Sequence, residues 1–371
     1  MNPFTTTGYR GPEYFCDREA ETEKLHRLLV NGNNVVLLAH RRIGKTGLIR
    51  HCVETNNLRN KYNVFIIDIF RTKDLQEFTL ALANAVVSDL RKFDEKALNV
   101  FLSIVTSLQG LLSSSVPGQP EMRLQYAGKP RPEFTLEQIF KYIGQSRRPC
   151  IIAIDEFQQI AKYPEKNTEA ILRTFTQQTP ESRYIFAGSE RRIMNRMFTD
   201  SSRPFYQSAT PIHLNAIDPD KYLEFAKEHF IKAEKELPDE IFSEIYGRFD
   251  GITWYVQKLL NEIYSIMKPK QKCDSVIFRK AFDDIIESYN YLYEETMYNL
   301  PQKQKELLIA FSKNGVTKEP QSETFLSKYG LTASSVQSAR RGLLQKELIT
   351  EELGTITLYD KFLDIWINRN Y

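Results

Sequence analysis

Four short runs of apolar residues in the first half of the chain predict buried strands. Each run is almost wholly apolar, as is typical of strands covered on both faces, and the runs span residues 35–38, 64–70, 150–154 and 184–188. Amphipathic stretches with helical spacing separate them, at residues 46–54, 75–93 and 134–145. Because strands alternate with helices of this length, we predict an α/β fold in which a parallel sheet forms the middle of three layers.

This pattern changes further along the chain. Residues 113–133 carry four prolines and two glycines, which predicts a loop between two helices. After about residue 215 the apolar spacing is helical, which predicts a second, helical domain. From Pro301 onward, three helical stretches precede two short β-like runs around Gly354, the order of a winged helix-turn-helix. We therefore predict three domains with the boundaries 1–215, 216–295 and 296–371.

Composition narrows the class of protein. The 371 residues include 50 Lys and Arg against 47 Asp and Glu, a net charge of +3, so binding to nucleic acid would require a local basic patch. No apolar run is long enough to span a membrane, and residues 1–15 lack the apolar core of a signal peptide. The four cysteines lie far apart, without metal-ligand spacing. We therefore expect a cytoplasmic protein without a disulfide framework or a zinc site.

The strongest chemical signal lies at residues 35–49, where the first predicted strand leads through a tight loop into a helix. The loop ends in Gly44-Lys45-Thr46, as in the phosphate-binding pattern G-x-x-x-x-G-K-[ST], with Ala39 in the place of the first glycine. Backbone N–H groups of such a loop converge on phosphates. We expect Lys45 to reach the terminal phosphates and the Thr46 hydroxyl to bind Mg²⁺. A positive φ at Ala39 would strain the loop without abolishing it.

Two adjacent acids, Asp155 and Glu156, follow the apolar run at 150–154. We predict that this strand lies beside the strand at 35–38, which leads into the phosphate-binding loop (the P-loop). In that arrangement Asp155 holds Mg²⁺ and Glu156 activates the attacking water. An acidic cap for the next helix would explain one of these acids but not both. A further predicted strand ends in Gly188-Ser189, where a hydroxyl can contact the terminal phosphate or the attacking water.

Together these motifs resemble the archaeal-type P-loop ATPases, a family allied to the STAND and AAA+ NTPases. Residues 41–46 (RRIGKT) match the family's R-R-x-G-K-T loop, and residues 155–158 (DEFQ) match its D-E-hydrophobic-Q acid strand. Residues 15–19 (FCDRE) resemble its F-x-G-R-E box, which helps to seat the adenine. The similarity continues through the helical-domain segment 247–257 to the winged-helix ending, Asp360-Lys361-Phe362 with Trp366.

The motifs and the resemblance imply ATP and Mg²⁺ as cofactors and suggest roles for individual residues. The catalytic candidates are Glu156, Lys45 and Ser189. The candidate metal ligands are Thr46 and Asp155. The nucleotide-binding candidates are Ala39, Arg41, Arg42, Ile43, Gly44, Lys45, Thr46, Gly47 and, from the N-terminal box, Arg18.

Three departures from the family's pattern bear on turnover. Ala39 replaces the first P-loop glycine, and Thr253 replaces the proline of the helical domain's G-x-P segment. Residues 207–208 are Gln-Ser where the resemblance implies Gly-Arg, so one arginine that could stabilise phosphate charge is missing. We therefore expect turnover that is slow or needs a partner's arginine. The other candidates for this role, in cis or towards a second copy of the chain, are Arg41, Arg42, Arg191 and Arg192.

The third helix of the predicted winged helix has one apolar face, formed by Val336, Ala339, Leu343 and Leu344. Its other face carries small polar side chains and an arginine, which suit entry into a DNA groove. The DNA-contact candidates are Ser334, Gln337, Ser338 and Arg341. However, residues 301–371 contain ten Lys and Arg against eight Asp and Glu, and a DNA reader usually has a denser basic footprint. Duplex DNA and a protein partner both remain open.

Three functions are compatible with the sequence. The first is a Mg²⁺-dependent ATPase that acts as a switch and controls DNA or protein contact through the winged helix. The second is a non-catalytic nucleotide-binding regulator, and the third is a DNA-binding protein with a vestigial P-loop. A homo-oligomer is compatible with each of them, and none requires a membrane.

Overall fold

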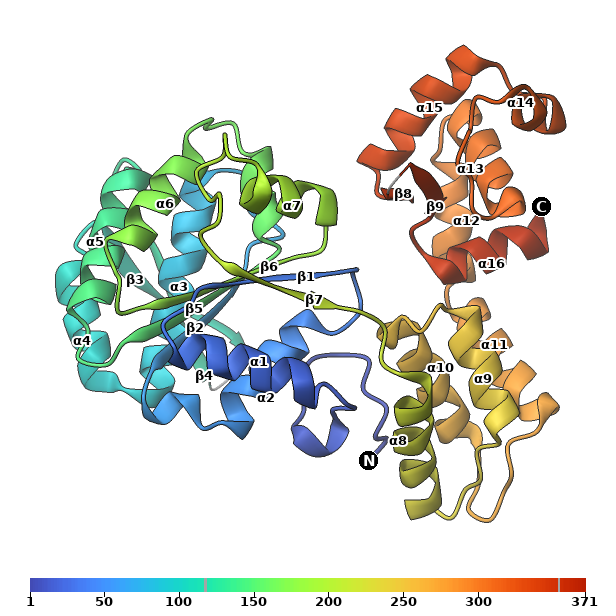
Figure 1. Ribbon diagram of the computed structural model, residues 1–371, viewed down its shortest axis with the longest axis horizontal. Helices are drawn as coiled ribbons and strands as arrows, with labels where there is room; N and C mark the ends of the chain where they lie inside the picture. The colour runs from blue at the N-terminus through green and yellow to red at the C-terminus, as the bar shows by residue number, and fades with distance from the viewer. Residues whose placement is uncertain (117–118, 353) are drawn as a thin grey trace. The chain divides into compact units, whose positions relative to one another are not determined.

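The computed structural model describes residues 1–116, 119–352 and 354–371. The chain divides into two compact units, one formed by Thr5–Tyr222 and the other by Met1–Phe4 together with Leu223–Tyr371. The first unit combines a sheet with helices, and the second is mainly helical (Figure 1).

The α/β unit is built on a five-stranded parallel sheet with the strand order β2-β5-β6-β1-β7. Its strands are β1 (Val35–Ala39), β2 (Asn63–Asp68), β5 (Cys150–Asp155), β6 (Arg183–Gly188) and β7 (Thr210–Leu214). Four of them lie where the apolar runs predict strands. The fifth, β7, escapes the pattern because the exposed Pro211 and His213 interrupt its apolar run at the edge of the sheet.

Helices cover both faces of this sheet (Figure 1). One face carries α1 (Glu19–Val30) and α2 (Lys45–Thr55), and the other carries α3 (Leu75–Phe93), α5 (Pro132–Gln145), α6 (Thr168–Gln177) and α7 (Arg191–Thr199). The large core lies on the second face, where Phe65, Ile152 and Phe186 of neighbouring strands pack with helix residues such as Phe78 and Leu136. The predicted three-layer α/β fold is therefore confirmed. The remaining helical segments are η1 (Pro12–Tyr14), η2 (Leu58–Asn60), α4 (Glu95–Ile104) and η3 (Phe157–Lys162).

A two-stranded antiparallel ribbon occupies much of the segment that the sequence predicts as a loop. It consists of β3 (Leu108–Val116) and β4 (Gln119–Tyr126), and residues 117–118 between them lie outside the described residues. The ribbon is tied to α3, because the Leu124 backbone N–H donates a hydrogen bond of 2.8 Å to Asn84 Oδ1. Proline does not exclude such a ribbon, since both of its strands are edge strands.

The second unit begins with helices that follow one another along the chain. They are α8 (Pro219–Lys232, which starts in the α/β unit), α9 (Asp239–Arg248), α10 (Thr253–Ile266), α11 (Ser275–Ser288) and α12 (Asn290–Tyr298). The first four residues of the chain join this unit. Phe4 is fully buried, with its ring centroid 5.3 Å from that of Phe230 and 5.7 Å from that of Tyr264.

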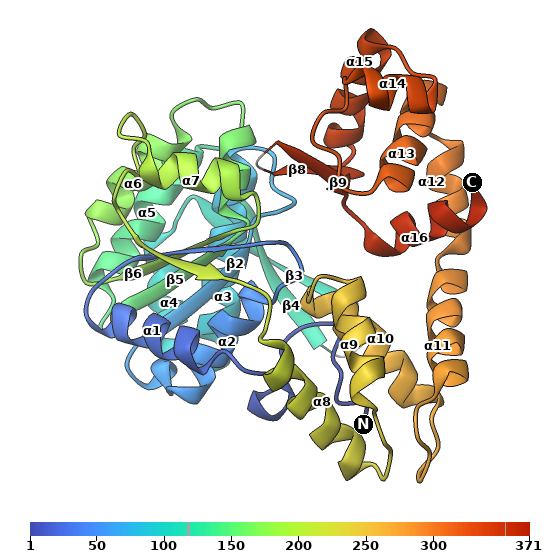
Figure 2. The ribbon, with the colours of Figure 1, turned by 45° about the vertical axis from the view of Figure 1, so that its right-hand side comes forward.

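The C-terminal part has the element order predicted for a winged helix. Three helices, α13 (Gln302–Asn314), α14 (Glu323–Tyr329) and α15 (Ala333–Gln345), precede the hairpin of β8 (Ile349–Glu352) and β9 (Thr355–Leu358), and α16 (Lys361–Asn370) follows (Figure 2). Gly330, with φ 63°, ends α14, and the Thr332 side chain caps α15. Asp360 caps α16 in the same way, and the Trp366 indole donates to Asn290 Oδ1 at 2.7 Å, so both residues have structural roles.

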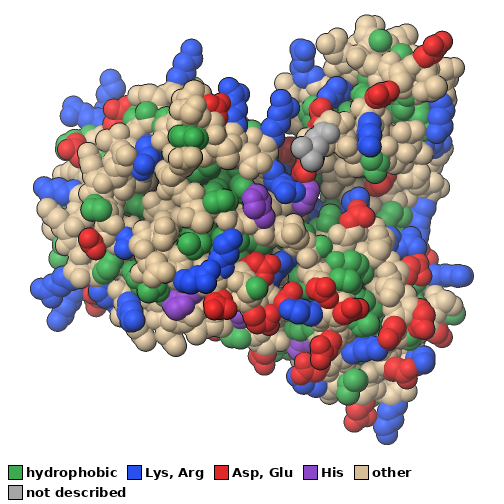
Figure 3. All heavy atoms as spheres, viewed as in Figure 1, with side chains coloured by type: hydrophobic (Ala, Val, Ile, Leu, Met, Phe, Trp, Pro, Cys, Tyr) green, Lys and Arg blue, Asp and Glu red, His purple; other side chains and the backbone are tan. Residues whose placement is uncertain are grey.

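The surface carries both signs of charge. In the view of Figure 3, Lys and Arg side chains are interspersed with Asp and Glu side chains, in keeping with the net charge of +3. Among the described residues, no helix has the length and apolar character needed to cross a membrane.

Candidate nucleotide-binding site

The P-loop connects β1 to α2 at the carboxyl edge of the sheet. Helix α2 begins at Lys45, and Gly44 before it has φ 104°, a left-handed conformation that glycine adopts without strain. Arg42 is also left-handed, with φ 66°, whereas Ala39 is a buried β1 residue paired with Leu214. The strain expected at Ala39 is therefore absent, because β1 extends through this position and the reversal of the chain occurs at Arg42 and Gly44.

Strand β5, which ends at Asp155, does not lie beside β1, the strand that leads into the P-loop, so the predicted neighbourhood of these two strands is wrong. Strand β6 lies between β5 and β1 and pairs with both of them. The apolar pattern cannot rank strands within a sheet, because all four buried runs look alike. The acids nevertheless reach the P-loop, since all five strands are parallel and their carboxyl ends share one edge.

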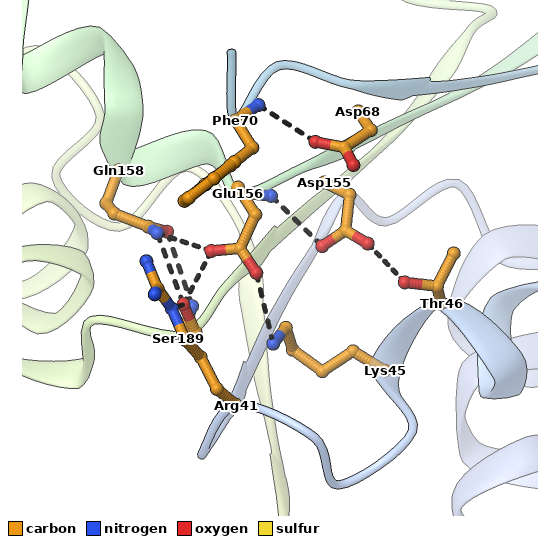
Figure 4. A network of polar contacts seen from close by, with 9 residues as sticks. All are labelled: Arg41, Lys45, Thr46, Asp68, Phe70, Asp155, Glu156, Gln158 and Ser189. Carbon is orange, nitrogen blue, oxygen red and sulfur yellow. Dashed lines mark hydrogen bonds and ion pairs between the residues drawn. The ribbon is translucent and has the colours of Figure 1, made fainter. Parts of the chain in front are cut away.

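Asp155, the last residue of β5, faces the start of α2 (Figure 4). Its side chain is buried, Oδ2 accepts a hydrogen bond from the Thr46 hydroxyl, and Oδ1 accepts one of 3.0 Å from the Glu156 backbone N–H. Burial raises the pKa of Asp155, although the nearby Lys45 ammonium opposes this effect. The structure thus brings the two predicted metal ligands, Thr46 and Asp155, into direct contact.

Glu156 directs its carboxylate towards Lys45 and Ser189 (Figure 4). The Lys45 Nζ lies 3.6 Å from Glu156 Oε1, and the Ser189 hydroxyl donates to Oε2 at 2.5 Å. Burial alone raises the pKa of Glu156, but the Lys45 ammonium and the hydrogen-bond donors outweigh it, so the pKa is below its ordinary value. Its backbone is left-handed, with φ 56°.

Gln158, the last residue of the D-E-hydrophobic-Q motif, connects Glu156 with Ser189. Its side chain is 1% exposed, and its Nε2 donates to Glu156 Oε2 at 2.5 Å and to Ser189 Oγ at 3.3 Å. Its Oε1 accepts the Ser189 backbone N–H at 3.3 Å. Gln158 therefore holds both predicted catalytic side chains in one orientation, and only the buried amide of the D-E-hydrophobic-Q motif could have indicated this.

Two further residues, which the motifs do not indicate, lie at the carboxyl end of β2. Asp68 ends β2 in register with Asp155, and its Oδ1 accepts the Phe70 backbone N–H at 2.8 Å. The Phe70 ring is 42% exposed and lies 5.1 Å from the guanidinium carbon of Arg41. The predicted strand at 64–70 conceals these positions, because the observed strand already ends at Asp68.

The N-terminal box, residues 15–19, is part of the α/β unit. Arg18 is buried, with Nη1 2.8 Å from Glu21 Oε1 and Nη2 donating to the Asn215 carbonyl at 2.7 Å. The Phe15 ring stacks on His51 at 4.3 Å and covers Gly47, where a Cβ would lie 3.1 Å from the ring. Arg18 thus anchors the start of α1 within the chain, and its predicted role in nucleotide binding stays a prediction.

The residues present fit a magnesium ion bound together with phosphates. No group of three or more His, Cys, Asp and Glu side chains suited to a metal occurs among the described residues. Mg²⁺ does not need such a cage, because it retains water molecules and takes one or two protein oxygens plus substrate phosphates. Thr46 and the buried carboxylate of Asp155 supply that kind of partial ligand set.

The predicted DNA-contact residues lie on the surface of α15. Ser334, Gln337, Ser338 and Arg341 are exposed, Val336, Ala339 and Leu343 are buried, and Leu344 is half-buried. The apolar face predicted for this helix therefore faces inward, and contact of the exposed residues with DNA stays a prediction.

Comparison with known proteins relates both parts of the chain to described families. A family model of an ATPase domain predominantly from Archaea matches residues 15–259, and one of a probable winged helix domain matches residues 291–369. Comparison with curated proteins finds no match.

Solved structures share the fold at low sequence identity. The Walker-type ATPase PABY2304 of Pyrococcus abyssi is 18% identical, with a TM-score of 0.63 and 99% of each chain covered. The ORC2 protein of Aeropyrum pernix, solved as ADPNP-ADP complexes, is 14% identical with a TM-score of 0.56, covering 99% of this chain and 98% of its own. The ORC1 protein of Aeropyrum pernix, solved in complex with DNA, is 14% identical with a TM-score of 0.54, covering 97% and 94%. With a P-loop, an acid pair and a winged helix on one chain, the protein belongs to the family of ATPase domains found predominantly in Archaea.

Proposed function

We propose that the chain binds ATP with Mg²⁺ at the P-loop and hydrolyses it slowly. One observation carries this proposal: Lys45 and Thr46 at the start of α2 each face one member of the acid pair, Glu156 and Asp155. A strand ended by an acidic helix cap would not need two acids, each opposite a different P-loop side chain.

Each residue has a distinct task in this reaction. Lys45 neutralises charge on the terminal phosphates, and Glu156 orients and deprotonates the attacking water. Thr46 and Asp155 hold Mg²⁺, which neutralises charge on the phosphate oxygens when bound. Lys45 Nζ lies 3.6 Å from Glu156 Oε1, so a phosphate that draws Lys45 towards itself also frees the carboxylate for the water.

We further propose that the state of the nucleotide controls contact with DNA or protein through the winged helix. The exposed polar face of α15, with Arg341 among small side chains, favours duplex DNA as the partner. The DNA complex of the Aeropyrum pernix ORC1 protein supports this choice by analogy of fold.

A cytoplasmic setting is supported by four cysteines that are all buried and free.

The substitution Glu156→Gln tests the proposal. It keeps the shape of the side chain but removes the base, so the variant should bind ATP and release no phosphate. Glu181→Gln, at an exposed position before β6, is the matched control and should hydrolyse ATP like the parent chain. Binding is measured with a fluorescent ATP analogue and turnover by phosphate release at high protein concentration.

Two results would contradict the proposal. Normal hydrolysis by Glu156→Gln would exclude Glu156 as the base. Tight ATP binding by the parent chain without phosphate release would favour a non-catalytic regulator instead.

A further inference from the structure

We propose that Arg41 is the arginine that stabilises charge on the transferred phosphoryl group, supplied by the same chain that binds the ATP. This inference rests on the proposed hydrolysis of ATP at this site. It replaces the expectation that a partner's arginine is needed.

Arg41 is held over the carboxyl edge of the sheet by contacts on two sides (Figure 4). Its Nε donates a hydrogen bond of 3.1 Å to Ser189 Oγ. Its guanidinium carbon lies 5.1 Å from the centre of the Phe70 ring, within the range of a cation–π contact. These two contacts fix the orientation of the guanidinium.

The order of strands places this guanidinium beside the proposed base. Arg41 follows β1, Ser189 follows β6, Glu156 follows β5 and Phe70 follows β2, so the four residues cover neighbouring strand ends in spatial order. Ser189 touches Arg41 and Glu156 at once, at 3.1 Å and 2.5 Å. An arginine so placed faces the region where the water and the terminal phosphate must meet.

The position of the missing arginine strengthens this assignment. Residues 207–208 lie just before β7, whose first residue, Thr210, pairs with Val35 at the amino end of β1. The P-loop follows the opposite end of β1, where Ala39 pairs with Leu214. Five residues of strand separate the two edges, about 13 Å along the sheet. An arginine at 207–208 would therefore lie beyond the reach of its own chain's phosphates.

Other arginines of the α/β unit have different surroundings. Arg18 bonds to Glu21 and to the Asn215 carbonyl. Arg191 lies 3.2 Å from His40, and Arg192 is exposed on α7. Arg41 combines contact with Ser189 and proximity to Glu156.

The test compares Arg41→Ala and Arg41→Lys with the full-length parent chain, and Arg196→Ala, at an exposed position of α7, serves as the matched control. Single-turnover hydrolysis should fall about 10³-fold in Arg41→Ala, the lower end of the range for a charge-stabilising arginine. Affinity for a fluorescent ADP should stay unchanged, because Arg41 acts on the transferred group. The trapping of ADP with aluminium fluoride, which mimics that group, should be lost in Arg41→Ala and kept in Arg196→Ala. Added guanidinium ion should restore part of the turnover of Arg41→Ala.

The outcomes separate this inference from the proposed function. If the parent chain neither hydrolyses ATP nor traps ADP with aluminium fluoride, the proposed function fails. If the parent chain does both and Arg41→Ala matches it, only the assignment of Arg41 is overturned. A parent rate per chain that rises with protein concentration, together with full activity of Arg41→Ala, would place the arginine on a second copy.

Discussion

The substitution Gly188→Ala tests how tightly the catalytic group is built into the core. Gly188 is the last residue of β6, directly before Ser189. A Cβ at this position would lie 2.5 Å from Met194 Cγ and Sδ and 2.6 Å from Gln158 Oε1. Ordinary contacts begin at 3.4 Å, so the neighbours must move by about 3.4 − 2.5 = 0.9 Å. Both are almost fully buried, with exposed fractions of 0% and 1%, so there is no open space to receive them.

The expected cost has two parts. Overpacking by one methyl group in a dense core destabilises by about 1–3 kcal/mol. Displacement of Gln158 also weakens a hydrogen bond to Glu156 or Ser189, for about 1 kcal/mol more. The sum is about 2–4 kcal/mol, and a unit of this size loses about 2–4 °C in Tm per kcal/mol. We therefore expect Tm to fall by about 4–16 °C.

Differential scanning calorimetry of the full chain measures this fall. The two tryptophans, Trp254 and Trp366, both belong to the helical unit, so calorimetry must report the α/β transition. Gly128→Ala is the control, because its Cβ would meet nothing within 4 Å and the residue is not left-handed. Its effect should stay within about 0.5 kcal/mol. Equal Tm values for the two variants would refute the reasoning.

Two further predictions concern the charges of the site and of the winged helix. Lys45→Met should lower Tm at neutral pH, because the buried Asp155 and the half-buried Glu156 lose their shared cation. The pKa of Glu156 lies below its ordinary value of about 4.3 in the parent chain, so the stability that Lys45 provides through Glu156 is present above that pH and is lost as the pH falls through the lower folded pKa; the deficit of the variant should therefore shrink below about pH 4.3. Calorimetry at several pH values checks it, and a deficit independent of pH would contradict the electrostatic explanation. Arg341→Ala should weaken binding to duplex DNA and reduce the salt slope by about 1, as measured by fluorescence anisotropy. An equal loss in Lys303→Ala, an exposed α13 variant, would argue against a specific role for α15.

Much of the fold follows from the spacing of apolar residues. The four buried strands, the helices between them and the winged helix are recognisable because each has a distinct period and characteristic turn residues. The order of the strands in the sheet cannot be recognised from the sequence, because the buried apolar runs look alike and nothing in their spacing says which of them are neighbours. The predicted pairing of β5 with β1 is wrong for this reason. The edge strand β7 escapes prediction for a different reason, because exposed residues interrupt its apolar run.

The same distinction applies to the residues of the nucleotide-binding site. Residues with a motif, such as Lys45, Thr46 and Asp155, are found by local spacing and meet in the structure. Residues that act across strands are not found this way. Phe70 and Gln158 reach the site only because β2, β5 and β6 end side by side.

A crystal structure of the chain grown with Mg²⁺ and a non-hydrolysable ATP analogue tests the central claim most directly. The account predicts the phosphates against the backbone N–H groups of residues 42–46, Lys45 turned from Glu156 to the terminal phosphate, and the metal on Thr46 and Asp155. A nucleotide bound elsewhere, or Lys45 still paired with Glu156 while the nucleotide is bound, would contradict it.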